Sequence, residues 1–436
     1  MARAAESAPL MSRRWPIVGN LPQLGRRALE SMREARHTLG PVFWIDMGFG
    51  NRTLMLTEEA GFEVLRSRSL DSSHMADIGT FLGHSMLTVD GKEHRRMRGA
   101  SSSAFTPGGL NRAKIGELIS ATVLRQLEGW KGANELQIVD ETKAVALDII
   151  FRMLGVEVDE LPEWAHWYSE FLLSAINIPI SLPGTPAWRG ARARRWLEPR
   201  VAAIIEDARE RGDHESVVGA MVHGRDKQGA GMSDKELIDN LLILALAGHE
   251  TTASTLAWSM IYLASSPASW DRLVAEATAM DEVPSDWSAL SAQAPFALGV
   301  FRESLRLYPP VHLDSRVAQG DIELCGYEIP DQTVVGTSIL LVSRNPERYP
   351  EPDTWRPERW LELERKPTPV ENCQFGGGAH FCLGYHMALL EGALFLTHAA
   401  RELASQGKRP LFEGQIPRPH YLPLTRPPAK LSIELV

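Results

Sequence analysis

Residues 375–384 read FGGGAHFCLG, and this stretch decides the expected architecture. Three consecutive glycines precede Cys382, and no proline follows it before about Ser405, so Cys382 is expected to open a long helix. Helix N-termini carry partial positive charge and free N–H donors, which stabilise a thiolate. Glycines let the backbone approach a flat partner closely, and Phe375 is placed to shield the sulfur from water. These are the properties of a soft axial iron ligand, although a lone cysteine is more often an inert core residue.

The composition of the 436-residue chain is that of an ordinary globular protein, with 44% hydrophobic and 23% charged residues. A chain of this length buries a large core without disulfides or structural metals. Its formal net charge of −9 provides no broad positive field, so no nucleic-acid partner is expected. The three cysteines, an odd and widely spaced set without a CxxC pair, indicate a reducing, cytoplasmic location (Cys325, Cys373 and Cys382).

The N-terminal residues contain neither a signal-peptide core nor the roughly 20 apolar residues that cross a bilayer, so no membrane anchor is expected. Residues 1–14 are predicted to form a flexible tail. The remainder, residues 15–436, is predicted to be a single domain, because no repeat, low-complexity tract or clear linker divides it.

The longest predicted element begins after Ser233, which forms a capping-box pattern with Glu236, and continues without proline to about Ser265. About 33 residues at 1.5 Å each give a helix of about 50 Å. Residues 238–248 are apolar on nearly every face, which predicts burial all round. The polar cluster at residues 249–252, His-Glu-Thr-Thr, conflicts with that burial and indicates a functional site.

The other patterns are mostly helical, with a minor β contribution. Residues 52–57, 322–329 and 333–342 are predicted strands, and residues 295–307 are a predicted helix. Residues 90–222 are predicted to be helical apart from breaks at 106–109 and 181–190, where prolines and glycines occur.

The string Phe-x-x-Gly-x-His-x-Cys-x-Gly resembles the haem-binding signature of the cytochromes P-450, the haem-thiolate monooxygenases. The resemblance implies their mainly α fold, with haem b (iron protoporphyrin IX) between the long central helix and the cysteine loop. It makes Cys382 the axial thiolate ligand. Residues 247–252, AGHETT, look like the family's oxygen-activation motif, so Thr251 and Glu250 are the expected proton donors. A threonine bonded back to the preceding helical turn beside a solvated glutamate is the alternative interpretation.

Two further motifs match the family in the same order along the chain. Glu303 and Arg306 form its Glu-x-x-Arg pair, and Arg359 lies in a segment similar to its Pro-Glu-Arg-aromatic segment. This triad is expected to stabilise the scaffold rather than act in catalysis. The resemblance also implies a set of residues around the haem and its propionates: His94, Arg98, Ala247, Arg316, Phe375, Gly376, His380 and Gly384.

Substrate contacts are assigned by analogy with the family, with core packing as the alternative for most of them. Polar His312 and Asp314 could anchor a hydroxyl or amine of the substrate, unless Asp314 bonds backbone N–H groups instead. The expected substrate-facing residues are Phe81, Leu82, Met86, Phe171, Leu244, Val311, His312, Leu313, Asp314 and Tyr421.

The implied activity is insertion of one oxygen atom from O2 into a lipophilic small molecule, by hydroxylation or epoxidation of a terpenoid, fatty acid or other natural product. A soluble, bacterial-type, monomeric member is expected. Its electrons would come from a separate ferredoxin and ferredoxin reductase or a flavodoxin-type donor, docked near Arg95 and Arg96. A peroxide-using or rearranging enzyme of the same fold, and a non-enzymatic haem sensor or electron carrier, are the alternatives.

Overall fold

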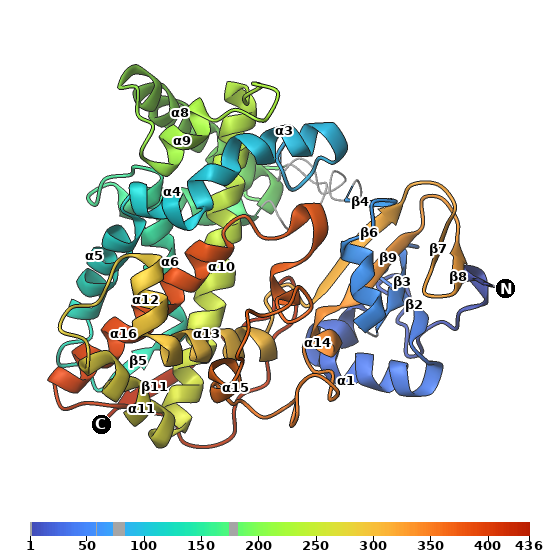
Figure 1. Cartoon of the computed structure of the whole chain (residues 1–436). Coiled ribbons are helices and arrows are strands. Elements are labelled where there is room, and N and C mark those ends of the chain that lie inside the picture. Colours follow the sequence, from blue (N-terminus) through green and yellow to red (C-terminus); the bar gives the residue numbers. More distant parts are fainter. Residues whose placement is uncertain (1, 58, 73–82, 174–181) are drawn as a thin grey trace.

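The computed structural model describes residues 2–57, 59–72, 83–173 and 182–436. Phe81 and Leu82, two of the expected substrate contacts, lie outside the described residues. Figure 1 shows two regions: helices gather around the long helix α10, and a smaller region holds the main β-sheet. Within the described part of the chain, no helix combines the length and the apolar character needed to span a membrane.

Helix α10 (Asp234–Ser265) is the axis of the helical region. Ser233 and Glu236 form the predicted capping box: the Ser233 side chain accepts from the Glu236 N–H, and the Glu236 carboxylate accepts from the Ser233 N–H. These reciprocal bonds satisfy two backbone donors that a helix start otherwise leaves unpaired. The length and position of the predicted central helix are therefore confirmed.

The helices packed directly on α10 explain why its sequence is apolar on most faces. Their contacts form one continuous core that includes the fully buried Trp130, Trp258 and Phe395. The neighbours are α6 (Ile138–Met153), α8 (Pro186–Glu210), α11 (Pro267–Thr278), α13 (Pro295–Leu307) and α16 (Tyr385–Ser405).

The two predicted breaks in the helical region are shorter than expected: Thr106 and residues 182–185 are non-helical, but the prolines that follow start helices. Pro107 and Pro186 occupy the first positions of α4 (Pro107–Arg112) and α8, and the side chains of Thr106 and Thr185 cap these starts. Proline fits the first turn of a helix, where its missing N–H would have no partner. The remaining helices are α1 (Leu21–Leu39), α3 (Gly91–Ser101), α5 (Ile115–Glu128), α7 (Leu161–Leu172), α9 (Val217–His223), α12 (Trp287–Gln293), α14 (Ile339–Val342) and α15 (Glu358–Leu361).

The main sheet has five strands in the order β2-β3-β9-β6-β4, with only β3 and β9 paired in parallel. The strand predicted at 52–57 is confirmed as β3. The strand predicted at 333–342 ends at Ser338, and the next four residues form α14; both segments are continuously buried, so hydrophobic periodicity alone does not separate them. The strands are β2 (Val42–Asp46), β3 (Arg52–Leu56), β4 (Leu70–Asp71), β6 (Leu313–Ala318) and β9 (Val334–Ser338).

The N-terminal residues are attached to the sheet region, so the prediction of a flexible tail over 1–14 is wrong for the described residues. Strand β1 (Arg3–Ala4) pairs with β8 (Tyr327–Ile329), which pairs with β7 (Ile322–Leu324). The Trp44 indole donates to Ala5 O at 2.9 Å, and Ala5 and Met11 are buried. Residues 3–11 are mostly small and show no hydrophobic periodicity, so the sequence gives no local indication that they pack on the sheet. A third sheet joins β10 (Pro410–Leu411), β11 (Ser432–Leu435) and β5 (Glu135–Gln137).

Candidate functional site

One face of the middle of α10 is only partly covered by the residues that the structure describes. Leu244, Ala247, Gly248 and Thr251 keep exposed surface, whereas Ala245, between them, is buried. Their spacing of i, i+3, i+4 and i+7 places them in one stripe along the helix. Leu244, Ala247 and Thr251, all predicted site residues, therefore share a largely apolar face that can receive a ligand.

The two expected proton donors have different surroundings. The Thr251 hydroxyl donates to Ala247 O at 2.6 Å, which is the back-bonded geometry named as the alternative interpretation. Glu250 is rotated by about 100° from Thr251 around the helix, and its carboxylate accepts from Lys143 Nζ of α6 at 3.3 Å. Lys143 was not predicted, because nothing in the sequence connects two residues 107 positions apart.

The cysteine loop is folded by backbone hydrogen bonds and close packing. The Cys382 N–H donates to Phe375 O at 2.8 Å, and the Phe375 ring lies edge-on to Tyr385 with centroids 4.8 Å apart. Gly378 has a φ of +63°, and a Cβ at this position would lie 2.3 Å from Leu65 O, so only glycine fits. Helix α16 begins at Tyr385 rather than at Cys382 as predicted, with Gly384 before its first turn.

Two cysteines lie near this loop, and their surroundings differ. Cys373 is fully buried in the core of the sheet region, with its Sγ 3.4 Å from Ser343 Oγ, and burial raises the pKa of its thiol to about 12. Cys382 is only partly buried. Burial raises the pKa of the Cys382 thiol, but the Gly384 N–H and the Arg98 guanidinium act in the opposite direction. The net direction for Cys382 is upward, so the Gly384 N–H and the Arg98 guanidinium only partly offset burial, and they are the groups that would stabilise a thiolate there.

Helix α3 brings cationic and imidazole groups to this loop. Arg98 Nη2 donates to Phe381 O at 2.6 Å, and the rings of His94 and His380 have centroids 4.2 Å apart. His380 Nε2 lies 2.7 Å from Asp90 Oδ1. Burial, followed by the proximity of His380 and Arg98, lowers the pKa of His94 to about 4. The structure thus brings together three predicted propionate-binding residues and adds Asp90, which was not predicted.

Strand β6 borders the loop on a further side. Arg316 Nη1 donates to Asp314 Oδ1 at 2.6 Å, and Asp314 Oδ1 also accepts from the Ser315 N–H at 2.8 Å. A Cβ built on Gly376 would lie 4.0 Å from Asp314 Oδ2, so this ion pair adjoins the cysteine loop. Asp314 Oδ1 is thus bonded to Arg316 and to the Ser315 N–H, and the bond to a backbone N–H is the alternative considered for this residue.

The donor set fits a flat, metal-containing group with two carboxylates. A partly buried thiol, two arginines and two histidines are contributed by three separate elements, and the stripe on α10 offers an apolar surface. A Cβ on Gly384 would meet no protein atom within 4 Å, so the space beside the start of α16 is open. These residues match what a haem requires: a sulfur ligand for its iron and cations for its propionates.

Glu303, Arg306 and Arg359 form a closed, buried network away from the open stripe. Glu303 accepts from Arg306 at 2.8 and 2.9 Å and from Arg359 Nε at 2.9 Å. It also accepts from the Arg356 N–H at 2.9 Å and the Trp360 indole at 3.0 Å. Arg306 donates further to three carbonyls of residues 343–354. This network fastens α13 to the segment that leads to the cysteine loop.

The remaining substrate candidates separate into exposed and buried positions. Met86 and Leu313 are half-buried, and Val311 is 41% exposed. Phe171 and Tyr421 are at least 95% buried, Phe171 against Tyr168 and Tyr421 beside Ala28 and Leu340, which is the core packing considered as the alternative for them. His312 is also buried and meets Tyr421 edge-on, and burial lowers its pKa to about 4.

Comparisons with known proteins agree with this geometry. The family model described as Cytochrome P-450 matches residues 9–406. The chain is 34% identical over 427 residues to the cytochrome P-450 BJ-4 homolog of Sinorhizobium fredii, covering 98% of this chain and 95% of that protein. It is 29% identical over 409 residues to cyclooctat-9-en-7-ol 5-monooxygenase of Streptomyces melanosporofaciens, covering 88% and 86%. The solved structure of retinoic acid-bound cyanobacterial CYP120A1 has a TM-score of 0.84 and 25% identity, with 99% of each chain covered.

The family match spans nearly the whole chain, and the similarity to a solved member extends over the same elements that build the site. Members of this family use haem with an axial cysteine thiolate and take electrons from redox partners. The chain therefore belongs to the cytochrome P-450 family and is a haem-thiolate monooxygenase.

Proposed function

We propose that this enzyme inserts one oxygen atom of O2 into a lipophilic small molecule held against the uncovered stripe of α10. The stripe itself carries the proposal, because it is apolar at Leu244 and Ala247 and ends at the hydroxyl of Thr251. A ligand there would lie in an apolar environment beside the Thr251 hydroxyl, which favours a substrate with a mainly hydrocarbon skeleton.

Cys382 Sγ is the proposed axial ligand, and Arg98, Arg316, His94 and His380 are the proposed partners of the propionates. When bound, the haem supplies the reductive activation of dioxygen. Phe375 packs on Tyr385 beside the loop and limits the access of water to the sulfur.

Thr251 is the proposed immediate proton donor. Its hydroxyl proton is held by Ala247 O, so the hydroxyl must exchange this bond for one toward the ligand when it delivers a proton. Glu250 is the proposed second donor. It is held by Lys143 and must turn away from that ammonium to reach Thr251. Glu250 would then transfer a proton to Thr251, and Thr251 would transfer one to the ligand.

The proposed substrates are terpenoids, with fatty acids as the second class to be screened. The names of two similar proteins mention cyclooctat-9-en-7-ol and retinoic acid, and both compounds are lipophilic molecules that carry one oxygen function. This agrees with an apolar stripe that has few polar groups. Displacement of the resting Soret band by members of a terpenoid and fatty-acid library would identify the preferred class.

The proposed docking surface for a separate ferredoxin or flavodoxin-type donor is the outer side of α3. Arg95 and Lys92 are exposed there, on the helix whose inner side carries His94 and Arg98 to the cysteine loop. Arg96, predicted to share this role, instead donates to Gly231 O at 2.6 Å and to Glu236. Reduction by an acidic ferredoxin should slow as salt rises and should slow further in Arg95→Ala.

The test of the proposed function compares the two cysteines near the loop. After reduction and addition of carbon monoxide, the wild type and Cys373→Ser should both show the strongly red-shifted Soret band of thiolate coordination. Cys382→Ser should lose that band. A wild-type protein without the band would contradict the proposed function, and loss of the band in Cys373→Ser alone would transfer the ligand assignment to Cys373.

A further inference from the structure

Asp90 stands at the N-cap of α3, yet its carboxylate does not cap the helix. Its backbone is extended, with φ −130° and ψ −176°, but its side chain accepts no hydrogen bond from α3, every residue of which the structure describes. An N-cap aspartate commonly accepts from the N–H two or three residues later. The carboxylate of Asp90 is therefore used for other partners.

Both oxygens of this carboxylate have such partners. Oδ1 lies 2.7 Å from His380 Nε2, and Oδ2 accepts at 2.7 Å from the N–H of Ser72, which directly follows β4. Burial raises the pKa of Asp90, but the bonds from His380 and Ser72 outweigh burial and lower this pKa overall. The carboxylate is thus ionised near neutral pH and can only accept, so the proton between Asp90 and His380 belongs to Nε2.

This bond fixes the imidazole ring of His380 and the nitrogen that is left for a ligand. A carboxylate that holds one nitrogen of an imidazole sets the orientation of the ring and determines which nitrogen remains for another partner. In His380 that nitrogen is Nδ1. The ring of His94, one turn along α3, lies against the His380 ring with centroids 4.2 Å apart and so limits its rotation.

Helix α3 thereby holds two successive residues of the cysteine loop. Asp90 bonds the side chain of His380, and Arg98 Nη2, near the other end of the helix, donates to Phe381 O at 2.6 Å. Cys382 follows directly. Both attachments therefore lie within two residues of the proposed axial sulfur.

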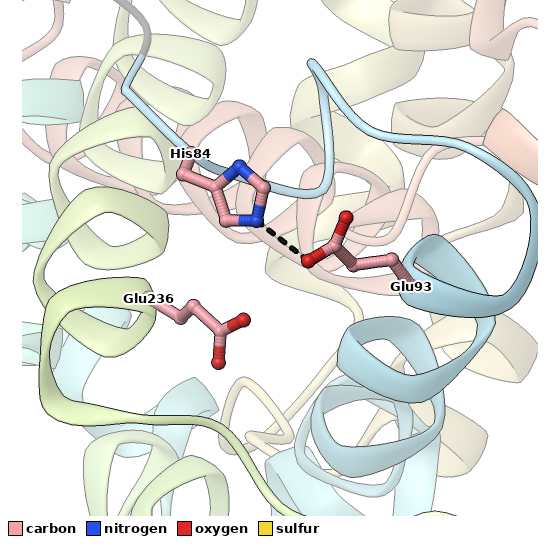
Figure 2. Close-up of side chains that lie close together, drawn as sticks. All are labelled: His84, Glu93 and Glu236. Carbon is pink, nitrogen blue, oxygen red and sulfur yellow. Dashed lines mark hydrogen bonds and ion pairs between the residues drawn. The ribbon is translucent and has the colours of Figure 1, made fainter.

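A second contact between a histidine and a carboxylate on α3 provides a comparison, and Figure 2 shows it. His84 Nε2 lies 2.7 Å from Glu93 Oε1, the same separation as in the Asp90 pair, but both side chains are 45% exposed. Those of Asp90 and His380 are 23% and 12% exposed. The two contacts have the same chemistry and length and differ in burial and in distance from the cysteine loop along the chain. Glu93 is therefore a matched control for Asp90.

We propose that Asp90 is a positioning residue for the haem: it orients His380 toward a propionate and holds the loop two residues before the axial sulfur. The inference deepens the proposed function and rests on it, because it requires haem beside Cys382. Asp90 then acts on the haem only through His380. Removing either side chain should weaken the same contact.

The experiment follows transfer of haem from the full-length holoenzyme to apomyoglobin at pH 7 in a double-mutant cycle. The variants are Asp90→Ala, His380→Ala and the double variant, with Glu93→Ala as the control. Loss of one charge-assisted hydrogen bond should accelerate haem transfer about tenfold in Asp90→Ala. His380→Ala should be at least as fast, and the double variant no faster than His380→Ala, because Asp90 then has no ring to orient. Glu93→Ala should transfer haem at the wild-type rate.

A conservative variant separates the hydrogen bond from a general loss of structure. Asp90→Asn keeps an acceptor oxygen for the Nε2 proton, so it should transfer haem more slowly than Asp90→Ala. It also takes the place of Asp90→Ala in the cycle if the alanine variant does not fold.

Three outcomes would overturn the positioning role. These are wild-type haem transfer in Asp90→Ala, equal acceleration in Glu93→Ala, and independent effects that multiply to about a hundredfold in the double variant. The last would show that Asp90 acts without His380. A wild-type protein that lacks the carbonyl band of thiolate coordination would instead contradict the proposed function. With that band present, any of the three outcomes contradicts the positioning role alone.

Discussion

Two groups of polar side chains differ in how completely their hydrogen bonds are made: one surrounds Glu303, and the other lies at the cysteine loop. Glu303 accepts five hydrogen bonds, and it is fully buried together with Arg306. The second group, on α3, the loop and β6, is bonded more loosely. Arg98, for example, donates to the carbonyl of Phe381, and Arg316 donates to its neighbour Asp314 and to Ser315 O.

This difference separates a structural network from a binding site. Buried polar groups cost free energy unless they are hydrogen-bonded, so a fully satisfied network is stable by itself and needs no ligand. In the second group, Arg98 and Arg316 are bonded mainly to backbone carbonyls and to Asp314, and they lie near the partly exposed thiol of Cys382. An anionic ligand would therefore stabilise this group further. The same residue types thus serve the scaffold in one place and the cofactor in the other.

Breaking the saturated network should have the largest effect on stability. Glu303→Gln leaves Arg306 and Arg359 buried without their counter-charge, which should lower the free energy of unfolding by about 3–5 kcal/mol. Urea unfolding measures this. The control is Glu358→Gln, because Glu358 forms an exposed pair with Arg272 at 3.0 Å and should cost at most about 1 kcal/mol. Similar losses of unfolding free energy in both variants would mean that the complete hydrogen bonding of Glu303 adds no stability beyond that of an exposed ion pair.

Removing an arginine from the group at the cysteine loop should weaken haem retention more than it lowers the stability of the fold. Arg98→Ala removes a donor from the proposed propionate site and should accelerate haem loss to apomyoglobin by about 10–100-fold, with a smaller effect on apoprotein unfolding. Arg95→Ala is the matched control on the same helix, because its side chain is exposed. Equal haem retention in the two variants would remove Arg98 from the site.

Removing the hydroxyl at the end of the stripe should leave both groups intact. In Thr251→Ala we expect haem and substrate binding to persist, while product formed per reducing equivalent falls about tenfold and hydrogen peroxide is released. Thr251→Ser keeps a hydroxyl and should retain most of the coupling. A fully coupled Thr251→Ala enzyme would show that another group delivers the proton.

The pair of Arg96 and Glu236, whose side chains are 25% and 11% exposed, should have the smallest effect, and one that depends on pH. Hydrogen bonding from Arg96 is the main cause that lowers the pKa of Glu236 from 4.5 to about 2. The pair therefore stabilises the fold fully above pH 4.5 and loses this contribution as the pH falls toward 2. Arg96→Gln should cost about 0.5–1 kcal/mol at pH 7 and less at pH 3. A cost that grows in acid, measured by urea unfolding at both values, would contradict this assignment.

The success of the sequence predictions depended on how far apart the interacting residues lie along the chain. The capping box of α10 and the contact between Glu303 and Arg306 were found because each is complete within four residues. The predicted breaks extend too far past Pro107 and Pro186, because proline occurs both at helix starts and at interruptions. The docked N-terminal strand was missed because its partner lies more than 300 residues away.

The sequence by itself determined the cysteine loop, the central helix with its polar cluster and the family to which they belong, because these depend on local spacing and on hydrophobic periodicity. Only the tertiary structure decided which stripe of α10 stays uncovered, that Glu250 is held by Lys143, and that Asp239 accepts from both His84 and Arg194 of α8. The physical reason is that exposure and ionic partners are set by side chains from distant segments. Their meeting depends on the packing of the whole chain rather than on any local pattern.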